Sequence, residues 1–107
     1  MKTEHLEWGL ALEGELDAMN AQQVDAALQE ALIESCGAFL IDLTGLTFMD
    51  SGGVNELLRA RSLLGREERE LVVVCPPGAP RRVLELIGIA DLFALFATRA
   101  EAEGALV

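Results

Sequence analysis

Two short runs of this sequence, residues 38–43 and 71–75, are apolar on both faces apart from Asp42. A strand with one face in water alternates apolar and polar residues, whereas a continuous run rich in β-branched residues is typical of a strand covered on both sides. Each run is followed by loop residues and then by a helical pattern. These two runs therefore predict central strands of a sheet that is covered by helices.

The rest of the chain alternates in the same way. Residues 8–16 alternate apolar and polar positions, starting at Trp8, which predicts a half-buried strand. Residues 92–96 are a short apolar segment that predicts an edge strand. Apolar residues at helical spacing predict four helices, which begin near Asn20, Ser51, Pro80 and Thr98. The repeated order of strand and helix indicates a single α/β domain with parallel crossovers.

Several residues are of types that are typical of the starts and ends of helices and strands. Asn20, with Gln23 three residues later, predicts a capped helix start, and Thr98 with Glu101 has the same spacing before a terminal helix over residues 99–106. Thr44 and Gly45 are expected to form the exit turn of the strand over residues 38–43. Three glycines are expected to end helices: Gly37, Gly65 and Gly88.

Composition limits the classes of partner. The chain has 107 residues, of which 51% are hydrophobic, and a formal net charge of −10 from 18 acidic and 8 basic side chains. Such a field repels nucleic acid and anionic membrane surfaces, so we expect neither as a partner. No apolar run approaches the ~20 residues that span a bilayer, and the N-terminus lacks the apolar core of a signal peptide, so we expect a cytoplasmic protein.

Ser51 is the residue whose position most favours a part in chemistry, and its surroundings in the sequence allow more than one interpretation. It lies between Asp50 and two glycines at the start of a predicted helix, where free N–H groups and the helix dipole favour negative charge. The simplest interpretation is an ordinary helix cap. A hydrolase nucleophile fits poorly, because the GxSxG pattern is absent and His5, near the N-terminus, is the only histidine.

Other candidate sites are weaker. Asp17, Asp42 and Asp50 would form a carboxylate cluster able to hold a divalent cation if the strand ends align, although solvated carboxylates are the simpler interpretation. The sequence has no phosphate-binding GxxxxGK[ST] loop. Cys36 and Cys75 lack metal-binding or redox spacing and are expected to be buried free thiols. Arg81 and Arg82 are expected on the wet face of their helix.

Three motifs together resemble one family. Residues 14–17 (GELD), 46–54 (LTFMDSGGV) and 84–93 (LELIGIADLF) look like those of the anti-sigma factor antagonists of the STAS domain family. The resemblance covers most of the chain, from about residue 8 onward. It implies one STAS-like domain over residues 1–107, with a mixed sheet of four to five strands, about four helices mostly on one side, and a first strand that is short or missing.

The resemblance also implies a function. Members of this type are partner-switching proteins, not enzymes, which bind an anti-sigma factor serine kinase when unphosphorylated and so release a sigma factor. The match places the phosphoacceptor at Ser51 and a kinase-facing aspartate at Asp17. The protein itself needs no cofactor or metal, because ATP and magnesium belong to the kinase. The expected partner-facing rim consists of Asp17, Asn20, Asp50, Gly52, Gly53 and Val54.

Two rival functions stay open at this point. Gly52 stands where the family often has a second hydroxyl residue, and only residues 1–7 precede the strand that starts at Trp8. Both departures favour a STAS subunit of a scaffold or transporter-associated complex, which would bind constitutively with Ser51 only as a cap. The other rival is a domain whose acidic strand ends bind a small ligand or a cation. The sequence identifies neither the partner, the controlled process nor the oligomeric state.

Overall fold

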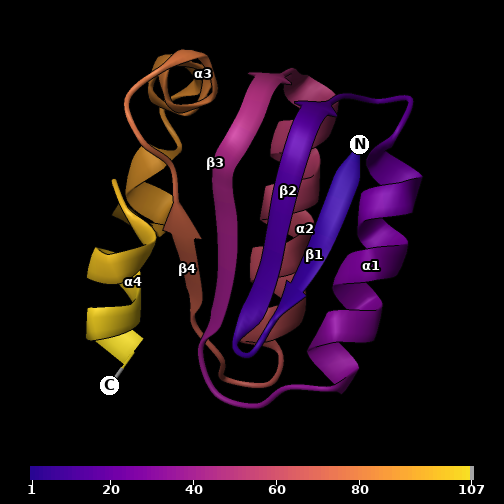
Figure 1. Cartoon of the computed structure of the whole chain (residues 1–107), viewed down its shortest axis with the longest axis vertical. Coiled ribbons are helices and arrows are strands. Elements are labelled where there is room, and N and C mark those ends of the chain that lie inside the picture. Colours follow the sequence, from indigo (N-terminus) through magenta and orange to yellow (C-terminus); the bar gives the residue numbers. More distant parts are fainter. Residues whose placement is uncertain (107) are drawn as a thin grey trace.

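The computed structural model describes residues 1–106. A single five-stranded sheet forms the centre of the molecule, with its strands in sequence order (Figure 1). Strand β1 pairs with β2 in antiparallel fashion, and every later neighbour is parallel, so the sheet is mixed as expected. The strands are β1 (Lys2–Leu6), β2 (Gly9–Leu16), β3 (Phe39–Met49), β4 (Leu71–Val74) and β5 (Ala94–Phe96).

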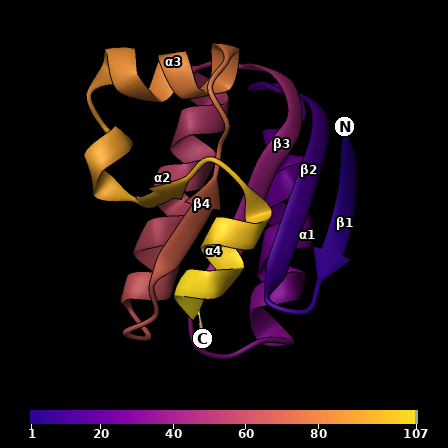
Figure 2. The same cartoon turned by 60° about the vertical axis from the view of Figure 1, so that its left-hand side comes forward.

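Four α-helices surround this sheet: α1 (Ala21–Ile33), α2 (Ser51–Gly65), α3 (Ala79–Ile87) and α4 (Arg99–Leu106), with a 3₁₀ turn at Ala90–Leu92. Since parallel neighbours in sequence order are joined by right-handed crossovers, successive crossover helices fall on the same face of the sheet. Helices α1 and α2 do lie together on one face, and α4 lies on the other (Figure 2). The fold is therefore the predicted α/β arrangement.

The two faces of the sheet have unequal cores. The larger core lies under α1 and α2 and joins Leu28 and Leu57 of these helices to Leu10, Phe39 and Val73 of the strands. The smaller core lies under α4, where Ala102 packs against Leu40, Val72 and Val74. Residues 39–43 of β3 and all of β4 are buried on both faces, as the continuous apolar runs predicted.

The N-terminal strand corrects one expectation. Residues Lys2–Leu6 form a five-residue edge strand, so the family's first strand is short but present. Trp8 belongs to the two-residue turn between β1 and β2, not to a strand, and it is 40% exposed. Alternation in β2 begins with the buried Leu10.

Strand β3 is longer than the sequence indicated. The exit turn predicted at Thr44 and Gly45 is wrong, because β3 continues through them to Met49. The extra residues stay extended because β2 runs beside them, with Gly14 opposite Leu46 and Leu16 opposite Met49. The last strand is also shorter than predicted, since residues Ala90–Leu92 form the 3₁₀ turn before it.

Helix ends match the sequence in part. Gly65 is the last residue of α2, Gly88 adopts a left-handed conformation after α3, and Thr98 Oγ1 accepts the Glu101 N–H before α4. Gly37 does not end α1, which stops at Ile33. The loop after α1 is fixed instead by Arg69, which donates to the carbonyl oxygens of Gly37 and Leu32 and to the Ser35 hydroxyl.

Candidate functional site

Ser51 is the first residue of α2, and its neighbour Asp50 caps the helix. The Asp50 carboxylate accepts the N–H of Gly52 at 2.8 Å and of Gly53 at 3.2 Å. The expectation that Ser51 is the cap is therefore wrong, because a carboxylate one residue earlier already takes the free helix donors. Ser51 is exposed, and its hydroxyl has no hydrogen bond to another described residue.

The loop between β2 and α1 lies beside this helix start. Asp17 Oδ1 accepts the N–H of Met19 and of Asn20, both at 3.0 Å, and Asn20 Oδ1 accepts the Asp17 N–H at 2.9 Å. Asn20 also donates to the Glu15 carbonyl oxygen. The predicted capping of α1 by the Asn20 side chain is wrong, because these contacts turn that side chain back toward the strand.

Two glycines let the loop and the helix come together. A Cβ on Gly52 would lie 2.8 Å from the Ala18 Cα, and a Cβ on Gly53 would lie 2.7 Å from Met49 Cγ. Real Cβ atoms do not approach other atoms so closely, so both positions require glycine. Gly52 thus brings the 17–20 loop against α2, although the family resemblance placed it on the partner-facing rim.

The predicted rim is only partly at the surface. The structure brings Asp17, Asn20 and Asp50 to one edge of the molecule, where β2 and β3 end. Gly53 and Val54 are buried, and the Val54 side chain belongs to the main core. Side-chain contact between a partner and Val54 is therefore excluded in this conformation, whereas Ser51 is freely accessible.

Sequence reasoning missed one residue at this edge. Met19, in the middle of the 17–20 turn, is 95% exposed, the most exposed of the large apolar side chains described. Hydrogen bonds on both sides of it hold the turn in one shape. A large apolar residue within a short polar turn was the available signal, since solvation alone does not favour it there.

Behind the site, α1 and α2 face each other through charged groups. Arg59 Nε lies 2.9 Å from Asp25 Oδ1 as an ion pair, although the geometry is not that of a hydrogen bond. Glu56 Oε2 is buried without a hydrogen-bond partner among the described residues. Burial raises the pKa of Glu56, the Asp25 carboxylate raises it further, and Arg59 lowers it. Glu56 is therefore not freely solvated.

The candidate carboxylate cluster of Asp17, Asp42 and Asp50 does not form. Asp42 pairs with Arg99, Asp50 caps α2 and Asp17 closes its own loop. Within residues 1–106 the structure brings together no group of three or more His, Cys, Asp or Glu side chains that suits a metal ion. The three aspartates therefore give no support to a cation site.

The two cysteines and Arg81 agree only in part with the surroundings predicted for them. Cys75 is buried as expected, but Cys36 is exposed, which corrects the sequence expectation. Arg81 is not simply on a wet face, because it donates to the Cys75 carbonyl oxygen at 3.0 Å. No helix in the described part of the chain has the length and apolar character needed to cross a bilayer.

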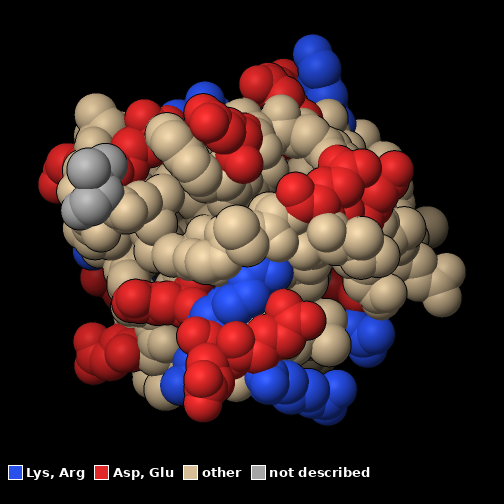
Figure 3. Space-filling view, turned by 90° about the horizontal axis from the view of Figure 1, so that it is seen from below, with Lys and Arg blue, Asp and Glu red and all other residues tan. Residues whose placement is uncertain are grey.

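Charge is spread widely over the surface. At the end of the molecule opposite Ser51, acidic side chains form several clusters around a smaller group of basic ones (Figure 3). In the segment between α2 and β4, Arg69 contacts Glu67 at 3.3 Å. The charge of −10 therefore does not mark the Ser51 edge alone.

Fold and site together define a small α/β domain that presents one free serine hydroxyl beside a rigid polar loop. Comparison with known proteins gives the family: the STAS domain model matches residues 8–102. The chain belongs to the STAS domain family, which confirms the resemblance seen in the sequence.

Several similar proteins of this family are named anti-sigma factor antagonists. The anti-sigma-B factor antagonist of Listeria monocytogenes is 29% identical over 102 residues, which cover 95% of this chain and 88% of the relative. The crystal structure of an anti-sigma factor antagonist from Mycobacterium paratuberculosis superimposes with a TM-score of 0.85 at 28% identity, covering 98% and 91% of the two chains. Unphosphorylated SpoIIAA, an anti-sigma factor antagonist, shares the fold with a TM-score of 0.77 at 24% identity, covering 97% of this chain and 93% of SpoIIAA.

Proposed function

We propose that this chain is an anti-sigma factor antagonist whose switch is phosphorylation of Ser51. In this proposal the unphosphorylated form binds an anti-sigma factor serine kinase, and the phosphorylated form is released. The names of the Listeria and Mycobacterium relatives support the class. The observation that carries the phosphoacceptor assignment is the free, exposed Ser51 hydroxyl at a helix start that Asp50 already caps.

The Asp50 cap explains why added charge would act strongly. A phosphate brings about −1.5 to −2 charges at neutral pH. The N–H groups of Gly52 and Gly53 that would otherwise stabilise it are already hydrogen-bonded to Asp50. Two unit charges about 4 Å apart repel by roughly 4 kcal/mol at an effective dielectric of 20, before salt screening. The phosphate would therefore extend from the domain as uncompensated charge.

Release then needs no refolding of the domain. The N–H groups of Asp17, Met19 and Asn20 already donate to oxygens within the loop, so the loop has little reason to turn them toward a phosphate. Repulsion and the cost of desolvating the phosphate at the contact surface suffice to oppose docking. In this proposal the protein is a cytoplasmic binding module without a cofactor, and the kinase supplies ATP and magnesium.

The test compares binding of four forms to the cognate kinase: wild type, Ser51→Ala, Ser51→Asp and the control Ser62→Asp. Ser62 is exposed on the same helix, three turns from the site, so its variant carries the same added charge elsewhere. We expect Ser51→Ala and Ser62→Asp to bind as wild type does and Ser51→Asp to bind weakly. Equal binding of Ser51→Asp and Ser51→Ala would show that charge at this position is not the switch.

Intact mass after incubation with the kinase and ATP separates this function from a constitutive STAS subunit. The switch predicts a gain of one phosphate in wild type and none in Ser51→Ala. A constitutive scaffold or transporter-associated subunit predicts binding without phosphorylation. The structure weakens that rival's account of Ser51, because the residue is not the helix cap.

A further inference from the structure

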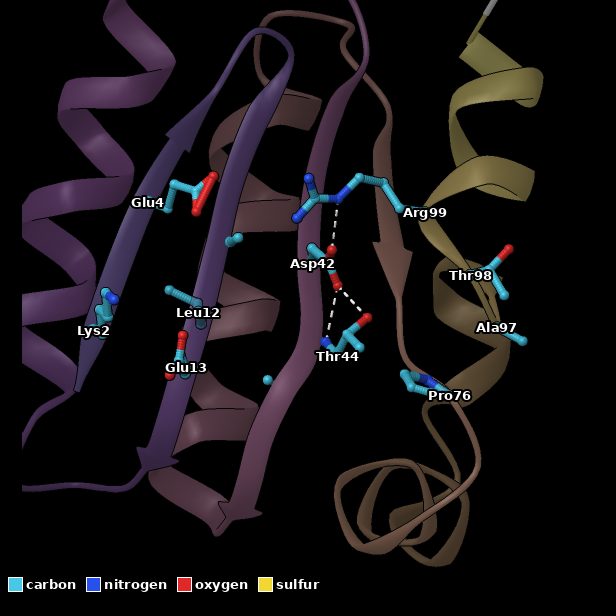
Figure 4. Close-up of a pocket in the computed structure, with 12 residues that line it drawn as sticks. Lys2, Glu4, Leu12, Glu13, Asp42, Thr44, Pro76, Ala97, Thr98 and Arg99 are labelled. Atoms are coloured by element: carbon cyan, nitrogen blue, oxygen red, sulfur yellow. Dashed lines mark hydrogen bonds and ion pairs between the residues drawn. The ribbon is translucent and has the colours of Figure 1, made fainter.

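The sheet face opposite α1 and α2 is only half covered. Helix α4 packs on β4, on β5 and on Leu40 of β3, and it leaves the same face of β1, of β2 and of the later part of β3 without a helix (Figure 2). A pocket of about 510 Å³ lies there, between the first turn of α4 and these three strands (Figure 4). Pockets of ~300–1,000 Å³ are the usual size for small-molecule ligands.

The floor of the pocket consists of residues from three neighbouring strands. Sheet register places Glu4 of β1, Ala11 of β2 and Asp42 of β3 in one row across the strands. In the next row Glu13 lies opposite Gly45. Ala11 leaves the backbone of β2 nearly bare, so a ligand can rest on the sheet there. Gly45 is covered instead, because a Cβ on it would lie 3.2 Å from the Cβ and the Cγ of Glu13.

One wall presents an arginine that a buried carboxylate holds in place. Asp42 is 4% exposed, and its Oδ2 accepts Arg99 Nε at 2.8 Å. Its Oδ1 accepts both the Thr44 N–H at 2.8 Å and the Thr44 hydroxyl at 2.6 Å. The Asp42 carboxylate therefore has its donors within the protein and anchors the Arg99 side chain through Nε.

The rest of this guanidinium is free for a ligand. Arg99 Nη1 and Nη2 have no hydrogen-bond acceptor among residues 1–106, and Figure 4 shows them on the β2 side of Asp42. A planar pair of N–H donors matches the two oxygens of a carboxylate. This wall thus suits a carboxylate group.

The opposite wall carries a net negative charge, because Glu4 and Glu13 line it together with a single cation, Lys2. The Glu4 side chain extends from β1 toward β2 (Figure 4) and makes no ion pair with a described residue. A purely anionic ligand would meet Glu4 and the net charge of −10, both unfavourable. A ligand that also carries a cationic group would place that group against Glu4.

We propose that this pocket binds a small zwitterion of the α-amino-acid class. The ligand carboxylate accepts hydrogen bonds from Arg99, and its ammonium group lies toward Glu4, across Ala11. Its apolar side chain points toward Pro76 and Ala97, which also line the pocket. The site is separate from Ser51 and does not depend on the function proposed above.

Calorimetric titration with L-leucine tests the proposal, with two analogues that each lack one charge. Leucinamide lacks the carboxylate, and 4-methylpentanoate lacks the ammonium group. We expect L-leucine to bind and both analogues to bind about tenfold more weakly or worse, because each loses a charged contact. Trp8 lines a smaller hollow that also touches Arg99, so its fluorescence supplies a second readout.

Variants locate the binding. Glu4→Gln should weaken the binding of L-leucine but not that of 4-methylpentanoate. Ala11→Leu should abolish the binding of L-leucine, because the larger side chain fills the floor of the pocket. Arg99→Lys keeps a positive charge near Asp42 but removes the planar pair of N–H donors. This variant should bind L-leucine weakly, and its circular dichroism should show that it remains folded. Glu15→Gln, an exposed change outside the pocket, is the control. No heat with L-leucine up to its solubility limit, equal binding of 4-methylpentanoate, equal competition by inorganic phosphate, or unchanged binding in Ala11→Leu would overturn the proposal.

Discussion

Gly52 faces Ala18 so closely that a Cβ on Gly52 would lie 2.8 Å from both the Cα and the backbone nitrogen of Ala18. The 17–20 loop and the first turn of α2 are therefore packed as one unit, although they are far apart in the sequence. Asp17 and Asn20 hold the loop from one side, and Asp50 holds the helix start from the other. Ser51 thus projects from a rigid edge.

Gly52→Ala should destabilise the domain by about 1–3 kcal/mol, because the new methyl group meets backbone atoms that cannot move aside easily. Gly65→Ala is the matched control on the same helix, where a Cβ would have open space. That variant should gain stability, by up to ~1 kcal/mol, since alanine favours a helix over glycine. Urea denaturation of both variants measures the difference, and a neutral Gly52→Ala would contradict the close packing.

Asp50→Ala should cost about 0.5–2 kcal/mol of unfolding free energy, because the Gly52 and Gly53 N–H groups lose their acceptor. Ser51→Ala should change stability by less than ~0.5 kcal/mol, since the exposed hydroxyl makes no hydrogen bond with a described residue. Asp50→Asn serves as the control, because an amide oxygen retains the cap. If Ser51→Ala were the more damaging variant in chemical denaturation, the cap assignment would be wrong.

The strands and helices were predictable where burial alone determines them. The runs at residues 38–43 and 71–75 and the helical pattern around Leu28 and Leu57 report which faces are covered, and covered faces leave a periodic signal. The long β3 was not predictable, because Thr44 and Gly45 look like a turn locally. Only the neighbouring β2, paired through Leu16, keeps them extended.

The location of the candidate site could be predicted from the sequence, but the contacts between its residues could not. The motif around Ser51 located the helix start, yet both Asp50 and Ser51 are good caps by residue type, and only the backbone geometry assigns the cap to Asp50. The burial of Val54 follows from its position in the helix against the core, whereas the exposure of Met19 depends on a turn stabilised by Asp17. The pairing of Asp42 with Arg99 joins residues 57 positions apart, which no local pattern reveals.

The two cysteines should differ sharply in reactivity. Cys36 is exposed, whereas Cys75 is buried, and burial raises the pKa of the Cys75 thiol to about 11 despite the nearby Arg81. Since the thiolate is the reactive form, the folded protein at pH 8 should react with a disulfide reagent rapidly at one thiol only. Cys36→Ser should abolish this rapid phase, and denaturant should expose the second thiol. Rapid labelling of two thiols in the folded protein would show that Cys75 is more accessible than its burial indicates.

Glu56 should make the domain less stable as the pH rises. Burial, and then the Asp25 carboxylate, raise the pKa of Glu56 above its ordinary value of 4.5, so the folded state holds this proton more tightly than the unfolded chain does. The stability from the protonated carboxyl is complete below pH 4.5 and is lost as the pH rises through the folded pKa.

Glu56→Gln removes this charge while keeping the shape of the side chain, and its amide can donate where the carboxylate cannot. We therefore expect the variant to melt at a higher temperature than wild type at pH 7, with the advantage shrinking toward pH 4. Glu30→Gln, an exposed change on α1, should show no such pH-dependent gain. Thermal melts of the three proteins across this range measure the effect. A pH-independent difference between Glu56→Gln and wild type would mean that the packing of α1 against α2, and not the proton on Glu56, controls the change.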